Sequence, residues 1–570
     1  MKIEMICAPY AGVDRPSLGL SILKSHAVNL GHDVSINYVN IDFVEHFGLS
    51  DYQKMVNSSP VDMAGECLIS RIYHSSLVEL NEEDLEIRQW YIDKGKELAF
   101  KGSDIYCFTC LFQQIRPSLW LAEEIKKIRP KSIIVFGGAA LDYPMGEQLF
   151  NSFKFVDCLF MGESEQTFVD YLNSVSKNEI YRHPSVLIRN QDIPLMTRAA
   201  TLADLNVSCA PDYEDYFERF RGSVLPIFIK PYIFYETSRG CSWGQRAQCT
   251  FCGLNGGSIG YRAKDPDKVI AEINYLKELY SNDIDELAFV DNIIPQNFYR
   301  EMLPKLIDNK SNITYFYEIK SNANYEELLS LKNAKVMRIQ PGIESLSTHI
   351  LKSMKKGVTA IQNISVLVNS ARLGIDVDWN ILLNIPGETD ESVESMFDVI
   401  PLLYHLQPPD ASSPFRLDRH SPVFLNPIEN GIKNIIPVKS YFYMYPELNE
   451  DEVFNLAYHF DFDENRTKKR IHLHHKIQDM IDFWKSGKYS LTHTVENTGI
   501  VKISDSRFEN IADYKLTKSC SDLYRYILSE KNSISIRKLT DFDVEDLNFL
   551  LSNRLLYKEF DRVIALSLEN

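Results

Sequence analysis

Three cysteines, Cys241, Cys249 and Cys252, form a C-x7-C-x2-C arrangement directly after an apolar run that is typical of a β-strand. A structural zinc site closes its coordination with four protein ligands, whereas three thiolates on an iron–sulfur cube leave one iron open to bind a small molecule. The spacing therefore predicts an open iron–sulfur site. A zinc site with a distant fourth ligand and three thiols without a metal are the alternatives. Glycines, expected where backbone wraps closely around a bulky centre, surround the cysteines at Gly240, Gly244, Gly253, Gly256 and Gly257.

The residues from Ser238 to Gly256 read SRGC-x7-CTFCGLNG, and here the chain resembles the radical S-adenosylmethionine (SAM) superfamily. The resemblance implies that the three cysteines hold a 4Fe-4S cluster, at which SAM is cleaved, and that Phe251 lies near the adenine of SAM. The common spacing in the superfamily is C-x3-C-x2-C, so this chain departs from it by four extra residues. The longer spacing and the CTFCGLNG motif are similar to cobalamin-associated members that mature ribosomally synthesised peptides.

Length and composition favour a globular enzyme of three or four domains in 570 residues. The net charge of −17 argues against a broad nucleic-acid surface, which would need basic patches. The ten cysteines are scattered, as in a reduced cytoplasmic protein rather than a disulfide framework. We find neither a secretory signal nor an apolar run of the roughly 20 residues that span a bilayer. We expect a cytoplasmic protein without a membrane or nucleic-acid partner.

Residues 1–200 alternate short apolar strands with amphipathic helices, which predicts a doubly wound, Rossmann-like parallel sheet with a helical insertion at about 43–101 over one edge. Ligands of such sheets bind beyond the carboxyl ends of the strands. The loops at those ends resemble the cobalamin-binding domain in front of many radical SAM barrels. The D-x-H-x-x-G motif is absent, so any cobalamin would lack a histidine ligand from it. The alternative is a degenerate domain for packing or peptide docking. The candidate cobalamin contacts are Thr109, Leu111, Gly137, Gly138 and Glu163.

After an acidic, aromatic linker at 201–231, residues 232–425 resume the alternation of strands and helices with longer units. Polar residues follow successive strands, and in parallel barrels that edge usually carries the active site. The pattern predicts a partial (β/α)6 barrel that resembles the radical SAM barrel. For Asp291 and Glu318, a helix N-cap or a buried salt bridge is the alternative. The candidate SAM contacts are Asp291, Asn292, Glu318, Lys320, Ser321, Gln340, Gly342, Glu344, Ser345 and Asn380.

A proline-punctuated passage contains Arg416, Asp418, Arg419 and His420. These side chains either face a substrate cavity or form an ion network that closes the barrel. Residues 426–570 are predicted to be mostly helical and to end in a winged-helix-like module for peptide binding or packing. The histidine run from His472 to Lys476 lacks cysteine or carboxylate partners at ligand spacing, so a metal site there is not expected.

The resemblance implies an enzyme that modifies a ribosomally synthesised precursor peptide, most often by cobalamin-dependent methylation of an unactivated carbon. It implies a 4Fe-4S cluster, SAM and cobalamin as cofactors, together with an external one-electron reductant. Three alternatives remain. The first is radical peptide modification without methyl transfer, the second is a tRNA methylthiotransferase, and the third is a non-catalytic peptide-binding protein. A second cysteine triad and a basic module, which the tRNA enzyme would need, are absent from the sequence.

Overall fold

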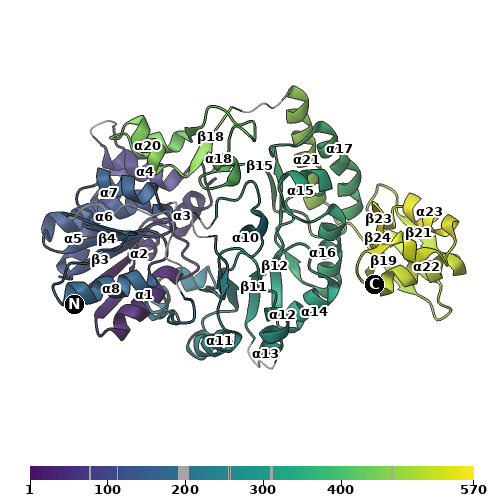
Figure 1. Cartoon of the computed structure of the whole chain (residues 1–570), viewed down its shortest axis with the longest axis horizontal. Coiled ribbons are helices and arrows are strands. Elements are labelled where there is room, and N and C mark those ends of the chain that lie inside the picture. Colours follow the sequence, from purple (N-terminus) through teal and green to yellow (C-terminus); the bar gives the residue numbers. More distant parts are fainter. Residues whose placement is uncertain are drawn as a thin grey trace.

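The computed structural model describes residues 1–75, 79–111, 113–190, 204–254, 256, 259–307, 312–463 and 467–570. The chain runs from an N-terminal sheet domain, through a barrel in the middle, to a small module that carries the C-terminus (Figure 1). A segment that follows the barrel returns to the N-terminal domain and lies across both. The expected α/β class is confirmed, because parallel sheets with flanking helices build both large parts.

The N-terminal domain is a six-stranded sheet in the order β2-β1-β3-β4-β5-β6. The first five strands are parallel, and β6 is antiparallel to β5. The near-continuous burial of β1, β3, β4 and β5 explains why they appear as apolar runs in the sequence. The chain order reverses between β1 and β3, which places the topological switch point at the carboxyl ends of these two strands. The strands are β1 (Lys2–Cys7), β2 (Asp33–Tyr38), β3 (Ile105–Thr109), β4 (Ile133–Gly137), β5 (Cys158–Phe160) and β6 (Val186–Ile188).

Helices cover both faces of this sheet. The region expected as an insertion over one edge contains four helices. The last of them, α5, returns the chain from β2 to β3 beside α6, where Tyr91 stacks on Trp120 with ring centroids 4.6 Å apart. This part therefore covers a face of the sheet and not only an edge. The helices are α1 (Leu18–Asn29), α2 (Val39–Phe47), α3 (Leu49–Val56), α4 (Ala64–Tyr73), α5 (Glu82–Phe100), α6 (Ile115–Ile128), α7 (Met145–Ser152) and α8 (Glu165–Ser176).

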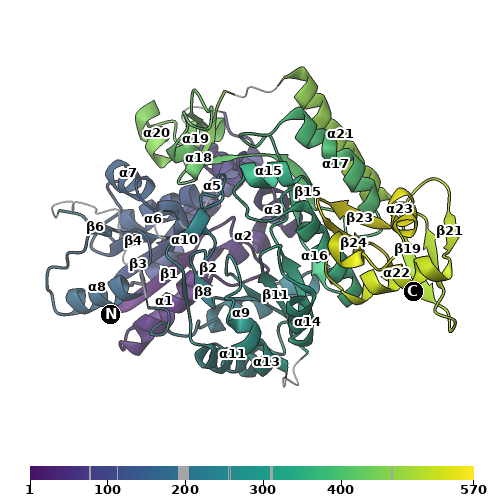
Figure 2. The ribbon, with the colours of Figure 1, turned by 45° about the vertical axis from the view of Figure 1, so that its right-hand side comes forward.

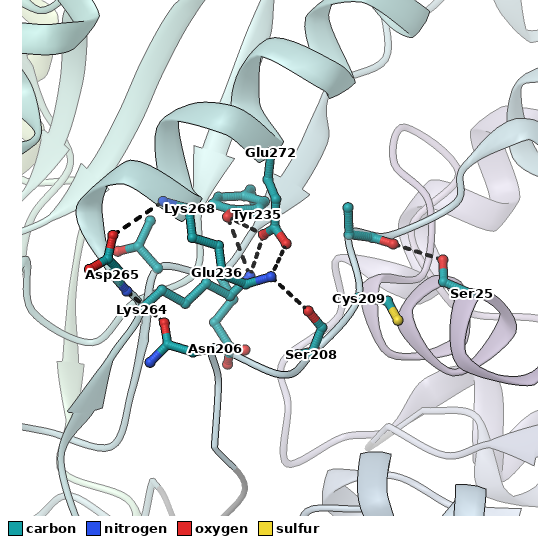
Figure 3. A network of polar contacts seen from close by, with 12 residues as sticks. Ser25, Asn206, Ser208, Cys209, Tyr235, Glu236, Lys264, Asp265, Lys268 and Glu272 are labelled. Carbon is teal, nitrogen blue, oxygen red and sulfur yellow. Dashed lines mark hydrogen bonds and ion pairs between the residues drawn. The ribbon is translucent and has the colours of Figure 1, made fainter. Parts of the chain in front are cut away.

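The linker between the two large parts is hydrogen-bonded on both sides. Lys268 Nζ of the barrel donates to the Ser208 carbonyl at 2.9 Å, and Ser25 Oγ of α1 donates to the Ala210 carbonyl at 2.7 Å (Figure 3). Further along, α9 (Glu214–Arg221) packs against the edge strand β2, where Asp215 accepts the Ile36 N–H at 2.8 Å. The segment is thus packed against both neighbours.

The barrel sheet has the order β13-β12-β11-β10-β7, and a parallel pair, β14 and β15, continues it. All neighbouring strands are parallel, and a bridge from Glu344 to Ile381 links the two pieces. The strands are β7 (Ile233–Tyr235), β10 (Glu286–Phe289), β11 (Thr314–Glu318), β12 (Val336–Gln340), β13 (Asp376–Val377), β14 (Asn380–Leu383) and β15 (Ala411–Pro414). The main outer helices are α11 (Pro266–Tyr280), α14 (Tyr325–Asn333), α15 (Thr348–Ser353), α16 (Ala360–Leu373) and α17 (Asp390–Val399).

The segment after the barrel forms a small antiparallel sheet in the order β16-β18-β17, with three short helices. Ser70 Oγ of α4 donates to the Met444 carbonyl at 2.8 Å, which fastens this segment to the N-terminal domain. In Figure 1 it lies in green above the space between the two large parts. The elements are β16 (Leu417–Asp418), α18 (Pro422–Leu425), β17 (Ile436–Pro437), α19 (Lys439–Met444), α20 (Glu450–Leu456) and β18 (His459–Asp461).

The histidine run lies on helix α21 (Lys468–Ser486), where His474 is buried and His472 and His475 are exposed. His474 Nε2 is 2.7 Å from Glu388 Oε1, and Arg470 pairs with the same carboxylate at 3.0 Å. Glu388 belongs to the loop after β14, so these contacts fasten α21 to the end of the barrel. No helix among the described residues is long and apolar enough to cross a membrane.

The C-terminal module contains more strand than the sequence suggested. It contains a four-stranded sheet, β21-β20-β19-β25, whose first three strands come before α22 and whose fourth is the last strand of the chain. Only helices and a short hairpin were expected. The part from α22 to the hairpin β23–β24 contains two helices and a three-stranded sheet, and Figure 2 shows it beside α16. The elements are β19 (Leu491–Val495), β20 (Val501–Asp505), β21 (Ala512–Lys515), α22 (Lys518–Ser529), β22 (Ile534–Ser535), α23 (Val544–Ser552), β23 (Leu556–Glu559), β24 (Arg562–Ala565) and β25 (Leu568–Glu569).

The turn after β4 gives a test of the fold, because it has room only for glycine. Gly138 has φ 119° and ψ 166°, and a Cβ there would lie 2.5 Å from the Cys110 carbonyl oxygen. We expect Gly138→Ala to cost roughly 2–4 kcal/mol from strain and backbone clash. The midpoint of thermal unfolding should fall by about 5–10 °C. Gly31→Ala is the control, since Gly31 has φ 81° but nothing within 4 Å of a Cβ. Equal losses in the two variants would contradict the close contact.

Candidate functional site

The cysteine loop, from Gly240 to Tyr261, begins and ends on a short antiparallel pair, β8 (Ser238–Arg239) and β9 (Arg262–Ala263). Burial raises the pKa of Cys252 to about 11, and the neighbouring thiols Cys249 and Cys241 raise it further. Burial also raises the pKa of Cys249. The three thiols therefore influence one another electrostatically at one place. A metal centre that binds all three must displace their protons, which a cation does readily.

Backbone approaches within the loop leave no space for side chains. A Cβ at Gly240 would lie 2.4 Å from the Gly260 carbonyl oxygen, and one at Gly253 would lie 2.5 Å from the Arg419 carbonyl oxygen. Within the described part of the chain, no set of three His, Cys, Asp or Glu side chains converges on a single metal ion. Three thiols in one tight loop are the number of cysteine ligands that an iron–sulfur cluster with one open iron accepts.

Two lysines lie beside the cysteines, and one of them was not predicted. Lys356 Nζ is 3.0 Å from Glu344 Oε1 and 5.6 Å from the centre of the Phe251 ring. Its positive charge lowers the pKa of Cys249 against the larger effect of burial. Gly342 makes space for this lysine, because a Cβ there would lie 2.8 Å from Lys356 Nζ. Lys356 follows the end of α15, outside the strand ends, so the sequence pattern gave no signal for it.

Lys320 is the second of these lysines. Its Nζ lies 3.0 Å from the centre of the Trp243 ring, and it has no hydrogen-bond partner among the described residues. Burial lowers the pKa of Lys320 to about 8. Trp243 is held in place, because its ring nitrogen donates to the Lys355 carbonyl at 3.0 Å. A buried ammonium over an aromatic face, with its N–H groups unused, is suited to bind an anionic or carbonyl group of a ligand.

Two predicted carboxylates at the strand ends, Glu318 and Glu344, belong to the group around the lysines. Burial raises the pKa of Glu318 to about 7, and Glu344 raises it further while Lys356 lowers it. Glu318, Glu344 and the two lysines therefore surround one side of the cysteine loop. Ser345 is buried instead and accepts the Ser347 N–H at 3.1 Å.

Other predicted residues lie outside this group. Gln340 and Asn380 are exposed at their strand ends, and Asn380 accepts the Ala411 N–H at 3.1 Å. Ser321 is fully buried, and its hydroxyl has no hydrogen-bond partner among the described residues. Asn292 donates to the Gly240 carbonyl at 3.1 Å and so holds the start of the cysteine loop. The sequence predicted all of these side chains as SAM contacts because they lie near strand ends. In the structure some are exposed and others are buried, so they do not form one group.

Asp291 supports the loop from inside the barrel. It is fully buried and accepts the Thr237 hydroxyl at 2.8 Å and the Thr237 N–H at 3.2 Å. Burial raises the pKa of this carboxyl to about 7. Thr237 immediately precedes the β8 strand, so its hydrogen bonds to Asp291 hold the backbone that leads into the cysteine loop.

A cavity of about 450 Å³ lies between the carboxyl ends of the N-terminal strands and the cysteine loop. Four of the predicted contacts, Thr109, Gly137, Gly138 and Glu163, line it. Leu111 is not part of the lining, and its side chain is 51% exposed. Apolar side chains of the N-terminal domain form much of the lining: Leu20, Leu23, Phe108, Val135, Phe160 and Phe168. The opposite wall comes from the residues that follow Cys252 and from the segment after the barrel, with Gly253, Leu254, Gly256, His420 and Tyr458.

Buried ion pairs join the two domains at the edge of this cavity. Arg239 pairs with Glu163 at 3.1 Å and with Glu165 at 2.6 Å, and both carboxylates belong to the region after β5. Arg239 also pairs with Glu236 at 2.7 Å, and Arg262 pairs with Glu163. Glu163, predicted as a cofactor contact, therefore also links the cysteine loop to the N-terminal domain. The two arginines were not predicted, although Arg239 belongs to the SRGC motif.

The passage from Arg416 to His420 contributes both an ion network and a side chain of the cavity lining. Asp418 pairs with Arg416 at 2.6 Å and with His459 at 2.7 Å, which forms an ion network between β16 and β18. Arg419 Nε donates to the Ala457 carbonyl at 2.7 Å and is structural as well. Only His420 of this passage lines the cavity.

The buried carboxyl of Asp291 gives a test through pH. Its pKa of about 7 lies above the roughly 3.9 of an unfolded aspartate, so the folded protein holds the proton longer as pH rises. The protonated Asp291 carboxyl therefore stabilises the folded protein fully below about pH 4, and this stabilisation is lost as the pH rises towards 7. We expect the thermal midpoint of Asp291→Asn, measured without cofactors, to rise relative to wild type from pH 5 to pH 8. The exposed Asp285 provides the control variant Asp285→Asn. Parallel curves for wild type and Asp291→Asn would contradict the assignment.

Comparison with known proteins identifies the barrel. Residues 235–400 match the model of the radical SAM superfamily. A curated relative, an uncharacterized methyltransferase from Pyrococcus horikoshii, is 23% identical over 321 residues, which cover 54% of this chain and 65% of that protein. The match thus spans less than two thirds of that relative. The match to the superfamily model implies a 4Fe-4S cluster and SAM, which the three-cysteine loop fits.

Solved structures extend the similarity to the whole architecture. The cobalamin-dependent SAM radical enzyme OxsB, with aqua-cobalamin and SAM bound, superposes with a TM-score of 0.57 at 15% identity, covering 84% of this chain and 66% of that chain. The radical SAM methyltransferase TsrM from Kitasatospora setae gives a TM-score of 0.50 at 15% identity, covering 75% of this chain and 76% of that chain. The protein therefore has a radical SAM domain at residues 235–400, within a fold similar to that of cobalamin-dependent radical SAM enzymes.

Proposed function

We propose that the protein is a radical SAM enzyme that uses cobalamin to methylate an unactivated carbon of a ribosomally synthesised peptide. The observation that carries this proposal is the shared wall between the cavity and the cysteine loop. Gly253 and Leu254, which directly follow Cys252, line the cavity on the side opposite the N-terminal strand ends. A ligand in the cavity would thus lie next to the metal centre.

The lining of the cavity fits a corrinoid in its chemistry. An apolar lining can take a flat or extended organic group, and small residues at Gly137 and Gly138 allow close approach of backbone. The curated relative is named a methyltransferase, and the superposed structures contain cobalamin or belong to a methyltransferase. The peptide substrate is supported by the resemblance of the CTFCGLNG motif to the peptide-maturing branch and by the acidic net charge of −17, which suits a basic or neutral peptide.

When bound, the reduced cluster with SAM supplies hydrogen-atom abstraction, and methylcobalamin supplies the methyl group. The residues of this chain bind, orient and shield. We assign Lys356 to the carboxylate of SAM, and Glu344 and Glu318 to its amine and hydroxyl groups, because they surround the cysteine loop. Lys320 over Trp243 supplies a second cation on the same side. The apolar cavity lining keeps water away from the reacting groups. The enzyme takes its electron from an external one-electron reductant.

The proposal is tested by anaerobic reconstitution with iron, sulfide and hydroxocobalamin, followed by metal analysis and a visible spectrum. We expect about four irons and one cobalt per chain, as the 4Fe-4S cluster and one corrinoid require. The triple variant Cys241→Ala, Cys249→Ala and Cys252→Ala should lose the iron and keep the cobalt, because its cavity is unchanged. Methyl-deuterated SAM should then transfer its label to a peptide substrate.

Each result has a distinct meaning. Iron without cobalt, together with deoxyadenosine formation and an unmethylated peptide product, would replace methyl transfer by another radical peptide modification. Zinc in place of iron would contradict the radical mechanism itself.

The role of Lys356 is tested by its affinity for SAM. Lys356→Met removes the ammonium group that we assign to the SAM carboxylate. Since hydrogen bonds to charged groups contribute roughly 1.5–3 kcal/mol, the dissociation constant of SAM should rise about 10- to 100-fold. Equilibrium dialysis on the reconstituted protein measures this constant. The adjacent and exposed Lys355 provides the control variant Lys355→Met, which should bind SAM as wild type does. Unchanged affinity in Lys356→Met would refute the assignment.

A further inference from the structure

His420 has an imidazole whose polar atoms the ion network does not use. It lines the cavity, while its neighbours Asp418 and Arg419 are engaged in structural contacts. The Nε2 atom is buried and has no hydrogen-bond partner among the described residues. Burial lowers the pKa of His420 to about 4, so the ring is neutral at physiological pH. A buried neutral ring nitrogen without a partner costs free energy unless a ligand satisfies it.

The backbone holds this histidine in an unfavourable conformation. His420 has φ 69°, in the left-handed region that few residues other than glycine adopt. Its neighbour Arg419 is anchored by a hydrogen bond from Nε to the Ala457 carbonyl and lies against the ring of Phe460 at 5.0 Å. The next residue, Ser421, caps helix α18 by accepting the Phe424 N–H. Strain of this kind is kept where the surrounding structure fixes it, and it concentrates at functional sites.

Two more polar side chains line the cavity near His420. Tyr458 reaches the loop wall, since a Cβ at Gly253 would lie 2.8 Å from its hydroxyl. Asp142 comes from the N-terminal domain, and its Oδ1 accepts the Gly162 N–H at 2.8 Å. Its other oxygen, Oδ2, lies 2.9 Å from the position of a Cβ at Gly256, and His420 Cδ2 lies 3.8 Å from the same point. Asp142 and His420 therefore approach the loop at the same glycine.

These three groups match one kind of ligand group. A carboxylate accepts hydrogen bonds, a phenol can donate one, and a neutral imidazole does either at a given nitrogen. A primary carboxamide needs the same set, because it carries two N–H donors and one carbonyl acceptor. Cobalamin bears primary carboxamides around the edge of its corrin ring. A carboxylate on the ligand would instead meet the negative charge of Asp142.

We propose that His420, with Asp142 and Tyr458, forms a recognition site for a peripheral carboxamide of a corrinoid in the cavity. This inference rests on the proposed function, because it takes cobalamin as the ligand. It assigns a specificity role to a residue of the segment after the barrel, which lies outside both the cysteine loop and the N-terminal sheet.

The experiment compares hydroxocobalamin with its monocarboxylic acid derivatives, in each of which one peripheral amide is replaced by an acid. Equilibrium dialysis against the iron-reconstituted protein gives the dissociation constants, and the visible spectrum reports the bound corrinoid. We expect wild type to bind at least one of these acids about tenfold more weakly than hydroxocobalamin, the size of one hydrogen bond to a charged partner. His420→Ala should weaken hydroxocobalamin binding and so reduce that ratio, while the repulsion of an acid by Asp142 remains.

Two further variants separate recognition from folding. His420→Asn keeps a side chain that tolerates the left-handed conformation and can hydrogen-bond, so it should retain more discrimination than His420→Ala. The exposed His349 on α15 lies away from the cavity lining, and His349→Ala should bind all corrinoids as wild type does. Iron content and the thermal midpoint of each variant show whether it is folded.

The outcomes separate this inference from the proposed function. If wild type binds hydroxocobalamin and its acids equally, or if the folded His420 variants keep the wild-type ratio, the recognition site is refuted and cobalamin binding stands. If wild type holds iron but binds no corrinoid, both the recognition site and the methyl-transfer function are refuted.

Discussion

The arrangement of the whole molecule depends on buried ion pairs between the cysteine loop and the N-terminal domain. Arg239 and Arg262 reach across to Glu163 and Glu165, and none of these side chains is more than about a fifth exposed. Charges that are largely removed from water favour pairing, because removing one partner leaves the other without compensation. The pairs fix the cysteine loop against the strand ends, and the cavity exists because of that fixed position.

Two further contacts make this position rigid. The linker is hydrogen-bonded to α1 on one side and to Lys268 on the other, as Figure 3 shows. The segment after the barrel is fastened to α4 through Ser70, and it supplies His420 and Tyr458 to the cavity. The cavity is therefore built by three parts of the chain, and each part is held by contacts with its neighbours.

Much of this architecture could be predicted from the sequence. The parallel sheet of the first 200 residues could be predicted, because most of its strands are buried on both faces and are short apolar runs. The cysteines and most of the loops around the cavity followed from spacing and from strand ends. Lys356 and Tyr458 could not be found this way, since their position depends on contacts with residues far away in the chain. The β19–β21 sheet was missed because its strands are half exposed and carry many polar residues.

The cavity wall also has a consequence for the order in which the protein is made. Glu163 leaves the ribosome before Tyr458, which follows about 300 residues later in the chain. At roughly 5–20 residues per second, the N-terminal sheet waits on the order of 15–60 s before the rest of its binding wall is synthesised. During that interval the sheet can fold, but its apolar lining remains open on one side. A large ligand thus meets the complete binding wall only after translation has passed the barrel and Tyr458.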